Sequence, residues 1–513
     1  MGGSMSRRIK WTAAVAALVL SAGAWSQAGR LPALGESEVW TLGQEQRLGD
    51  DLRRSLYQGD EVLEDGLLGD YLADIWAPLF ESAQRQGFLT PALAQRFDWT
   101  LLVINDRAVN AFAMPGGVVG VNVGLLAMTD QPAQVAAVLA HELSHVTQRH
   151  IPRLLERQNQ VTPLAVGAML LAVVAASQGG GDGAQAAFIG GQAALAQTGI
   201  NFTRSMEREA DRIGWMIYQG AQYPQAGFGA MFTKLYESSR LSDDGDYPYL
   251  RTHPLNHERL AEVAVRQQGS VPEPERSSPV NERWGQWMQA RAQVLSTQRT
   301  EDWAAWQQLA QALPQRALTA AQQVTLYKGA LSAWKLGAHA QAWSWLQTLA
   351  QQQQFPDVGR VIRSDQLALW ATPGEVLAAN DVVQPWVAEG LGSKRRGEWL
   401  AAAHAALRLG QPAAVVSKAQ SWVVTQPLDG PAWDVLALAR EQQGQVLRTL
   451  RAQAEAQEAR GNSEGAIDRL VAAQRWSRDH PQQDPVEAQV VLTRERALRQ
   501  AMVDRQKESE SRP

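Results

Sequence analysis

The stretch His141-Glu142-Leu143-Ser144-His145 holds two histidines four residues apart. A helix start signal at Thr129–Pro132 precedes it, and the helix should run to about Arg149. Residues four apart share one helical face, so both imidazoles can reach one metal ion. Glu142 lies about 100° around the helix and can reach a water next to that ion. Apolar neighbours predict a buried helix, where unpartnered polar groups are costly, so a metal site is favoured over an ordinary amphipathic helix.

The residues that can complete such a site are few. The 513-residue chain has no cysteine and only 8 histidines, so a third ligand must be a histidine or a carboxylate. Glu207 and Asp211 lie four residues apart at the start of another predicted helix, on one face. One carboxylate can bind the metal, and the other can hold a histidine ring in the correct tautomer. Alone, such a pair is typical of a solvated helix face; beside the histidine motif it is the best candidate.

Periodicity predicts the secondary structure around the motif. Glu36–Phe80 has apolar residues at helical spacing, whereas Phe97–Ile104 and Val119–Val123 have the pattern of strands. A turn is predicted at Met114–Gly117. The Val119–Val123 strand could lie at the edge of a sheet, where an extended substrate would add to it by main-chain hydrogen bonds. The alternative is a strand that is simply buried.

Two further segments, Leu164–Ala176 and Ala184–Ala196, are rich in small and apolar residues, with a glycine run between them. A helix as long as the first would measure roughly 20 Å, which is too short to span a bilayer. The segments predict a helical hairpin packed on the domain. The alternative is a mobile cover, or a peripheral contact with a membrane surface, near the site.

The N-terminal residues predict a secretory signal peptide at 1–26. Arg7, Arg8 and Lys10 precede the apolar segment Trp11–Leu20, and small residues follow. An uncleaved membrane anchor is the alternative, although this apolar segment is short for a span of ~20 residues. We therefore expect the mature chain to be exported.

Composition narrows the class of protein. Hydrophobic residues make up 45% of the chain and charged residues 19%, which is typical of a globular protein of about two to four domains. The formal net charge of −4 makes nucleic acid a poor candidate partner. Thirteen of the 19 tryptophans lie at or beyond Trp284, so the two halves of the chain are built differently.

The C-terminal half predicts an array of helical repeats. Trp399 and Trp433 are 34 residues apart, and so are Gly410 and Gly444. A period of 34 residues is that of the tetratricopeptide repeat, a pair of helices joined by a turn. In such an array the tryptophans and leucines fill the space between helix pairs. A few of the tryptophans on a concave face could instead contact a partner.

Three stretches of the sequence resemble the M48 family of zinc metalloproteases: His141–His145, Glu207–Asp211 and Thr252-His253-Pro254. Asn110–Leu126 is similar to that family's strand before the zinc helix. A signal peptide in front and tetratricopeptide repeats behind resemble the family's periplasmic beta-barrel assembly-enhancing protease subgroup. The resemblance implies a mainly α fold with a small β-sheet, in which an α+β zincin-type metalloprotease domain is followed by an α-helical tetratricopeptide-repeat array.

Together the composition shifts and the resemblance predict the domain borders. The signal peptide is expected at 1–26 and the metalloprotease domain at 27–268. A proline-containing linker is expected at 269–298, the repeats at 299–503 and a polar tail at 504–513.

The resemblance also implies a role for single residues around one Zn²⁺ per chain. It implies three zinc ligands, a general base and a residue that supports a ligand; these are His141, His145 and Glu207 as ligands, Glu142 as base and Asp211 as support.

The same resemblance implies a role for His253, which from the sequence alone is a lone histidine in a loop. It either approaches the zinc as a further ligand and holds the site latent, or assists at the transition state. Arg259 matches a basic position of that motif. His150 and His257 also lie near the motifs and compete as ligand candidates.

The resemblance implies a periplasmic zinc metalloendopeptidase that degrades misfolded or stalled outer-membrane beta-barrel proteins and assists their assembly. The repeats would recruit the outer-membrane assembly machinery, and no nucleic acid is involved. The alternative is a repeat-based periplasmic chaperone or adaptor with little proteolysis.

Overall fold

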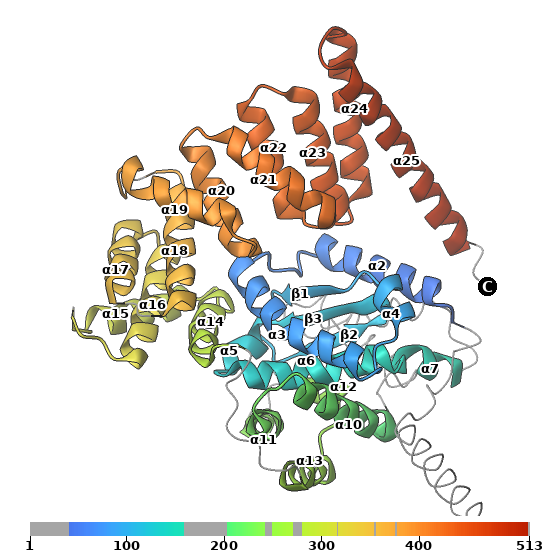
Figure 1. Cartoon of the computed structure of the whole chain (residues 1–513), viewed down its shortest axis with the longest axis vertical. Helices are drawn as coiled ribbons and strands as arrows, with labels where there is room; N and C mark the ends of the chain where they lie inside the picture. The colour runs from blue at the N-terminus through green and yellow to red at the C-terminus, as the bar shows by residue number, and fades with distance from the viewer. Residues whose placement is uncertain are drawn as a thin grey trace, which may run out of the picture. The chain divides into compact units, whose positions relative to one another are not determined.

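The computed structural model describes residues 40–157, 203–241, 249–269, 280–314, 316–352, 355–374 and 377–510. Leu42–Pro513 form one compact unit. The expected signal peptide and both glycine- and alanine-rich segments lie outside the described residues. Within the described ranges, the helices are too short or too polar to cross a membrane. The expected class, mainly α with a small sheet and a helical array, is confirmed (Figure 1).

The sheet consists of three short strands: β1 (Thr100–Ile104), β2 (Ala111–Met114) and β3 (Val118–Asn122). Their order is β1-β3-β2, with β1 parallel and β2 antiparallel to β3. The predicted turn is confirmed as a 3₁₀ turn, η1 (Pro115–Gly117), in which both glycines have positive φ angles. The sheet is thus of mixed direction, with a tight turn joining β2 to β3.

Of the two alternatives for Val119–Val123, the buried strand is confirmed and the edge strand is wrong. β3 covers most of this segment, pairs on both sides and is buried along its whole length. Its main-chain groups are therefore already used, and an added substrate strand cannot pair with it. The valine pattern cannot distinguish a central from an outer strand, because both bury such residues.

The helices around the sheet position the histidine motif. α6 (Pro132–Thr147) is buried at every residue and packs against β2 and three helices: α3 (Gly66–Arg85), α10 (Arg204–Gly220) and α11 (Gln225–Leu241).

The helical stretch expected at Glu36–Phe80 is two helices, α2 (Leu42–Gln58) and α3, because the chain turns at Gly59–Asp65 and Val62 pairs with β1. The remaining helices of this region are α4 (Pro91–Arg96), α5 (Val123–Met128), α7 (His150–Arg157), α12 (Tyr249–Thr252) and α13 (His257–Gly269).

The C-terminal region is a chain of helices in which neighbours in sequence are mostly neighbours in space. Gly410 and Gly444, which defined the 34-residue period, end helices with positive φ angles of 72° and 70°. Glycine adopts this conformation without strain, so it suits the turn between two paired helices. The helices are α15 (Thr300–Gln311), α16 (Ala320–Lys335), α17 (His339–Gln352), α18 (Pro356–Ala371), α19 (Asn380–Gly392), α20 (Arg396–Arg408), α21 (Pro412–Thr425), α22 (Gly430–Gln442), α23 (Val446–Ala459), α24 (Ser463–Asp479) and α25 (Pro485–Glu510).

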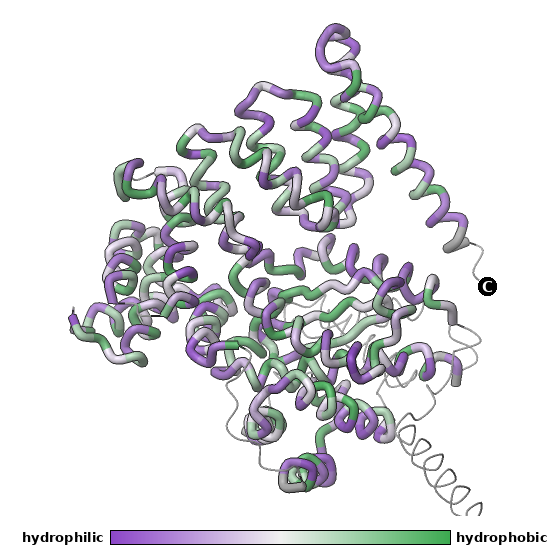
Figure 2. The backbone as a smooth tube through the Cα atoms, in the orientation of Figure 1, coloured by the Kyte–Doolittle hydropathy of each residue, from purple (hydrophilic) through white to green (hydrophobic). Residues whose placement is uncertain are grey.

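Tryptophans pack inside this array, as the sequence predicts. Trp399 is completely buried, and Trp343 and Trp370 are nearly so. Along the helices, hydrophobic and hydrophilic residues alternate at close intervals (Figure 2), as expected where one face of each helix is covered. The buried residues of α15–α22 belong to the same core as the sheet region, and a separate cluster of buried residues runs through α23, α24 and α25.

The segment expected as a linker contains a buried helix, α14 (Glu282–Leu295). Its Arg291 donates to both carboxylate oxygens of Asp65, at 2.9 and 2.8 Å, and to Asp365 at 2.7 Å. Asp65 caps α3, and Asp365 belongs to α18. The α14 helix thus joins the two regions; the exact domain borders stay predictions.

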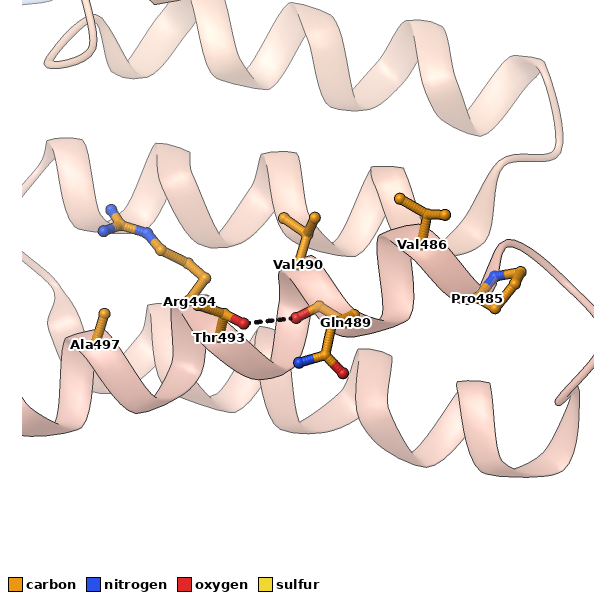
Figure 3. Close-up of a pocket in the computed structure, with 7 residues that line it drawn as sticks. All are labelled: Pro485, Val486, Gln489, Val490, Thr493, Arg494 and Ala497. Carbon is orange, nitrogen blue, oxygen red and sulfur yellow. Dashed lines mark hydrogen bonds between the residues drawn. The ribbon is translucent and has the colours of Figure 1, made fainter.

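The end of the array is a long helix, α25, which continues through the described part of the expected polar tail. Figure 3 shows its outer side, where Val486 and Val490 follow one helical face. Val486 is 75% and Val490 42% exposed, and a shallow pocket runs along them to Ala497. The last helix of the array therefore exposes apolar side chains along one face.

One close backbone contact between the two regions is glycine on glycine. A Cβ atom on Gly397 would lie 2.6 Å from the carbonyl carbon of Gly66, and one on Gly66 would lie 2.7 Å from Gly397 Cα. Beside them, the Gly397 N–H donates to buried Asp70 at 2.9 Å. α3 and α20 can approach this closely only because neither position has a side chain.

We predict that Gly397→Ala lowers the free energy of unfolding by about 1–3 kcal/mol, because the backbone must move to make room for a methyl group. Gly359→Ala is the control, since a Cβ there meets nothing within 4 Å and the residue lies inside α18. The control should be neutral or slightly more stable. Chemical denaturation measures both, and equal stabilities of the two variants would contradict the close-contact argument.

Candidate metal centre

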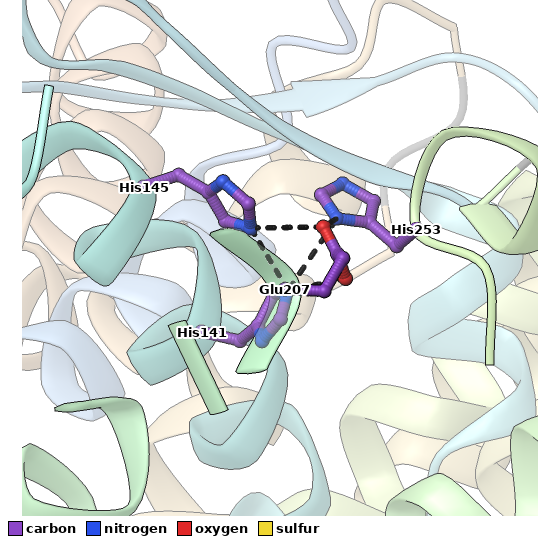
Figure 4. Close-up of side chains that lie close together, drawn as sticks. All are labelled: His141, His145, Glu207 and His253. Atoms are coloured by element: carbon purple, nitrogen blue, oxygen red, sulfur yellow. Dashed lines mark hydrogen bonds and ion pairs between the residues drawn. The ribbon is translucent and has the colours of Figure 1, made fainter. Parts of the chain in front are cut away.

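The two histidines of the motif project from α6 toward one point. His141 Nε2 and His145 Nε2 are 3.0 Å apart, and both side chains are buried. They lie one turn apart, as the sequence predicts. Figure 4 shows the two rings converging from the same helix.

Glu207 enters this point from α10. The helix begins after Thr203, whose hydroxyl accepts from Met206 N, so Glu207 lies in the first turn. Further along, a Cβ on Gly214 would lie 3.1–3.2 Å from the backbone of Ala140 and His141. A glycine at 214 therefore lets α10 pack closely on α6 and bring its carboxylate to the histidines.

His253 completes the group, just after the short α12 helix. Its Nδ1 lies 3.0 Å from Glu207 Oε1 and 3.4 Å from His141 Nε2. The backbone N–H of His253 donates to the backbone carbonyl oxygen of Tyr249 at 2.8 Å, and its ring stacks on the Tyr249 ring. The backbone and the stacked ring thus fix the side chain over the cluster.

The spacing of these atoms fits a metal ion. One ligand atom from each of His141, His145, Glu207 and His253 lies within 4.8 Å of the others, and all four side chains are buried. Glu207 Oε1 is 3.5 Å from His145 Nε2, and Glu207 Oε2 is 3.5 Å from His141 Nε2. A tetrahedral ion with ligands ~2.0–2.1 Å away keeps neighbouring ligand atoms about 3.3 Å apart. The separations of 3.0–3.5 Å between the atoms named here are compatible with this geometry, and every pair of ligand atoms lies within 4.8 Å.

Asp211 supports the site from behind. Its Oδ1 lies 3.0 Å from His141 Nδ1, on the side of the ring away from the cluster. Arg259 donates to both carboxylate oxygens of Asp211, at 2.8 and 2.9 Å, and lies 2.8 Å from Glu207. Although burial acts to raise the pKa of Asp211, His141 and Arg259 hold that pKa below its usual value.

These carboxylates also dominate the protonation of His141. Burial alone would lower the pKa of its imidazole, but Asp211 and Glu207 raise the pKa to about 10. In His145, by contrast, burial and the neighbouring His141 hold the pKa well below its usual value. The cluster therefore carries positive charge at one ring when no cation is bound, a charge that a divalent metal would replace.

Glu142 is buried next to the group. Neither of its carboxylate oxygens has a hydrogen-bond partner among the residues that the structure describes. The nearest basic atom recorded for it is His253 Nε2, 3.6 Å from Oε1. Buried carboxylates are normally hydrogen-bonded, so these oxygens are suited to a water or a substrate group.

The structure separates the competing histidines. His150 lies behind His145, with the two Nδ1 atoms 3.0 Å apart, and its Nε2 is 3.2 Å from Glu209 Oε2. The hydrogen bond from His150 is the main reason that the pKa of Glu209 falls to about 2. His257 is exposed and pairs with Tyr236 instead. Neither histidine presents a nitrogen to the cluster.

The structure therefore brings together every residue that the sequence and the resemblance selected. Sequence reasoning missed the contacts of Glu209 and His150, and it missed Tyr249 beneath His253. The sequence could have indicated that Glu209 faces away from the ligand cluster, because it is two residues from Glu207 and so points to another side of α10. The signal for Tyr249 was absent, since a tyrosine before a loop histidine has no chemical pattern.

Part of the chain is similar to a known protein family. Residues 84–267 match the model described as peptidase family M48. The beta-barrel assembly-enhancing protease of Escherichia coli (strain K12) is 35% identical over 245 residues, which cover 47% of each chain. That of Yersinia pestis is 28% identical over 473 residues, or 88% of this chain and 90% of the relative.

The chain is also similar, at lower coverage, to a mitochondrial protein. The mitochondrial metalloendopeptidase OMA1 of Arabidopsis thaliana is 28% identical over 200 residues, 38% of each chain. The chain spans about half the length of the Escherichia coli relative that it matches. Residues 84–267, which carry all four side chains of the buried group, therefore match the model of peptidase family M48, and the chain is similar to the beta-barrel assembly-enhancing proteases.

Proposed function

We propose that the protein is a zinc metalloendopeptidase. The observation that carries this proposal is the buried His141–His145–Glu207–His253 group at tetrahedral spacing, with the unbonded carboxylate of Glu142 beside it. Nitrogen and carboxylate donors without cysteine suit Zn²⁺. The M48 relatives support a peptide substrate.

The chemistry divides between the ion and the chain. Zinc held by His141, His145 and Glu207 would act as a Lewis acid and make a neighbouring water acidic enough to attack at neutral pH. Glu142 accepts a proton from the attacking water and delivers it to the leaving amine nitrogen. Asp211 and Arg259 keep His141 oriented throughout.

His253 holds the resting site latent in this proposal. Its Nδ1 lies at ligand spacing from His141 and Glu207, so it would take the coordination position that a water needs for catalysis. A substrate or partner would have to displace the ring. The alternative role, assistance at the transition state, requires His253 to leave the ligand cluster first.

The substrates we propose are misfolded or stalled outer-membrane beta-barrel proteins, with the helical array recruiting the outer-membrane assembly machinery. The printed names of the relatives and the large array behind the peptidase domain support this. We place the protein in the periplasm, exported by its expected signal peptide. A repeat-based chaperone or adaptor with little proteolysis is the second candidate, and the position of His253 in the cluster favours it.

We predict that Glu142→Gln lowers peptide hydrolysis by about 10²–10⁴-fold, because glutamine keeps the shape of the side chain but cannot accept the proton. Zinc content should not change, since Glu142 is not a ligand. Turnover of an unfolded outer-membrane protein by the purified, zinc-loaded chain measures the effect. Glu389→Gln, at an exposed position in α19, is the matched control. Undiminished turnover by the Glu142 variant would make the second candidate the correct one.

We predict that His253→Ala raises hydrolysis severalfold while zinc stays bound, because three ligands remain and the fourth position opens for water. His257→Ala should leave hydrolysis unchanged, as His257 lies outside the cluster. Initial rates on an unstructured peptide distinguish the variants. A fall in rate for His253→Ala would show that the ring assists the reaction and does not block it.

A further inference from the structure

The two histidines on α6 differ in how their outer nitrogens are held. His141 Nδ1 faces the carboxylate of Asp211 directly, at 3.0 Å. His145 Nδ1 faces another histidine, His150, also at 3.0 Å. A metal-bound histidine ordinarily donates its second N–H to a carboxylate, a carbonyl or water, so the environment of His145 calls for an explanation.

The hydrogen positions in this chain of groups follow from the geometry. If His145 Nε2 binds the metal, its Nδ1 carries the hydrogen and donates to His150 Nδ1. His150 then carries its hydrogen on Nε2, which lies 3.2 Å from Glu209 Oε2 and donates to it. Arg153 donates to the same oxygen at 3.0 Å. One tautomer of each ring satisfies these contacts, with both rings neutral.

The backbone is shaped to make this contact. α6 ends at Thr147, and Arg149 adopts a positive φ angle of 51°, which is unusual for a residue with a side chain. Arg149 Nε donates to the buried carboxylate of Glu45 on α2 at 2.8 Å. The chain turns between the two helices at this residue, and His150, the first residue of α7, lies completely buried against His145.

The two ligand histidines thus have parallel supports. Behind His141 stands a carboxylate, Asp211, fixed by an arginine, Arg259. Behind His145 stands a carboxylate fixed by an arginine as well, but with one imidazole inserted between ligand and carboxylate. A carboxylate in either place makes the ring nitrogen on the metal side a better donor.

We propose that His150 and Glu209 are positioning residues of the metal centre, which act as a histidine–carboxylate relay that fixes the tautomer and orientation of His145. This rests on the proposed metal site, since the relay has a direction only if His145 Nε2 is a ligand. The two residues contact neither the ion nor the substrate; they act through His145.

The relay predicts a graded effect on metal affinity. His150→Leu removes the acceptor for His145 N–H and should weaken Zn²⁺ binding by about 10–100-fold. His150→Asn can place its side-chain oxygen where Nδ1 was, and should recover most of the loss. Glu209→Gln keeps the shape and an acceptor oxygen but loses the charge, and should weaken binding severalfold. His257→Leu is the control and should bind like the unchanged chain.

The experiment is a Zn²⁺ competition titration of the full chain against a chelator, with the visible absorption of the Co²⁺-loaded protein as a second measurement. The thermal midpoint of the metal-free proteins is measured in parallel. A purely structural histidine would lower that midpoint for both His150 variants and leave their Zn²⁺ affinities alike. The relay requires the leucine variant to bind more weakly than the asparagine variant and to shift the Co²⁺ bands.

The outcomes separate the two proposals. Zn²⁺ affinity of His150→Leu within threefold of the unchanged chain overturns the relay. If that variant does not fold, Glu209→Gln decides, and unchanged affinity there overturns the relay as well. If the unchanged chain itself binds no Zn²⁺, or if Glu207→Ala binds as well as the unchanged chain, the metal site itself fails.

Discussion

The close approach of α10 to α6 is the contact on which the rest of the site depends. It brings Glu207 and Asp211 to opposite sides of His141, so one carboxylate reaches the ligand cluster and the other holds the ring. Gly214 makes the approach possible, because a Cβ there would press on the backbone of Ala140 and His141. Buried charges at such short range are stable only when each is paired, and here Arg259 and the proposed cation supply the positive charge.

Much of this arrangement could be predicted from the sequence. The spacing of His141 and His145, and of Glu207 and Asp211, follows from the helical period, and helices at both places are confirmed. Because the chain has no cysteine, the third ligand had to be a histidine or a carboxylate. His253 needed the family resemblance, since a single histidine in a loop has no periodicity that could place it. Its position depends on long-range packing around Tyr249.

Other parts could not be predicted, for physical reasons. The sequence left open whether the valine-rich segment is an edge or a buried strand, because the residue pattern reports burial and not strand order. The contact between His150 and His145 depends on the left-handed conformation of Arg149, which no residue type there requires. The segment expected as a linker holds a buried helix, because Arg291 pairs with aspartates from both regions. Such contacts join residues far apart in the chain, where local spacing carries no information.

We propose that the buried cluster is a metal centre in which His253 takes the fourth position. The most direct test is the anomalous diffraction of a crystal of the zinc-loaded protein, measured at the zinc absorption edge. We expect one strong peak within bonding distance of Nε2 of His141 and His145, a Glu207 oxygen and Nδ1 of His253. A folded, zinc-loaded chain with no peak at that position would contradict this metal centre.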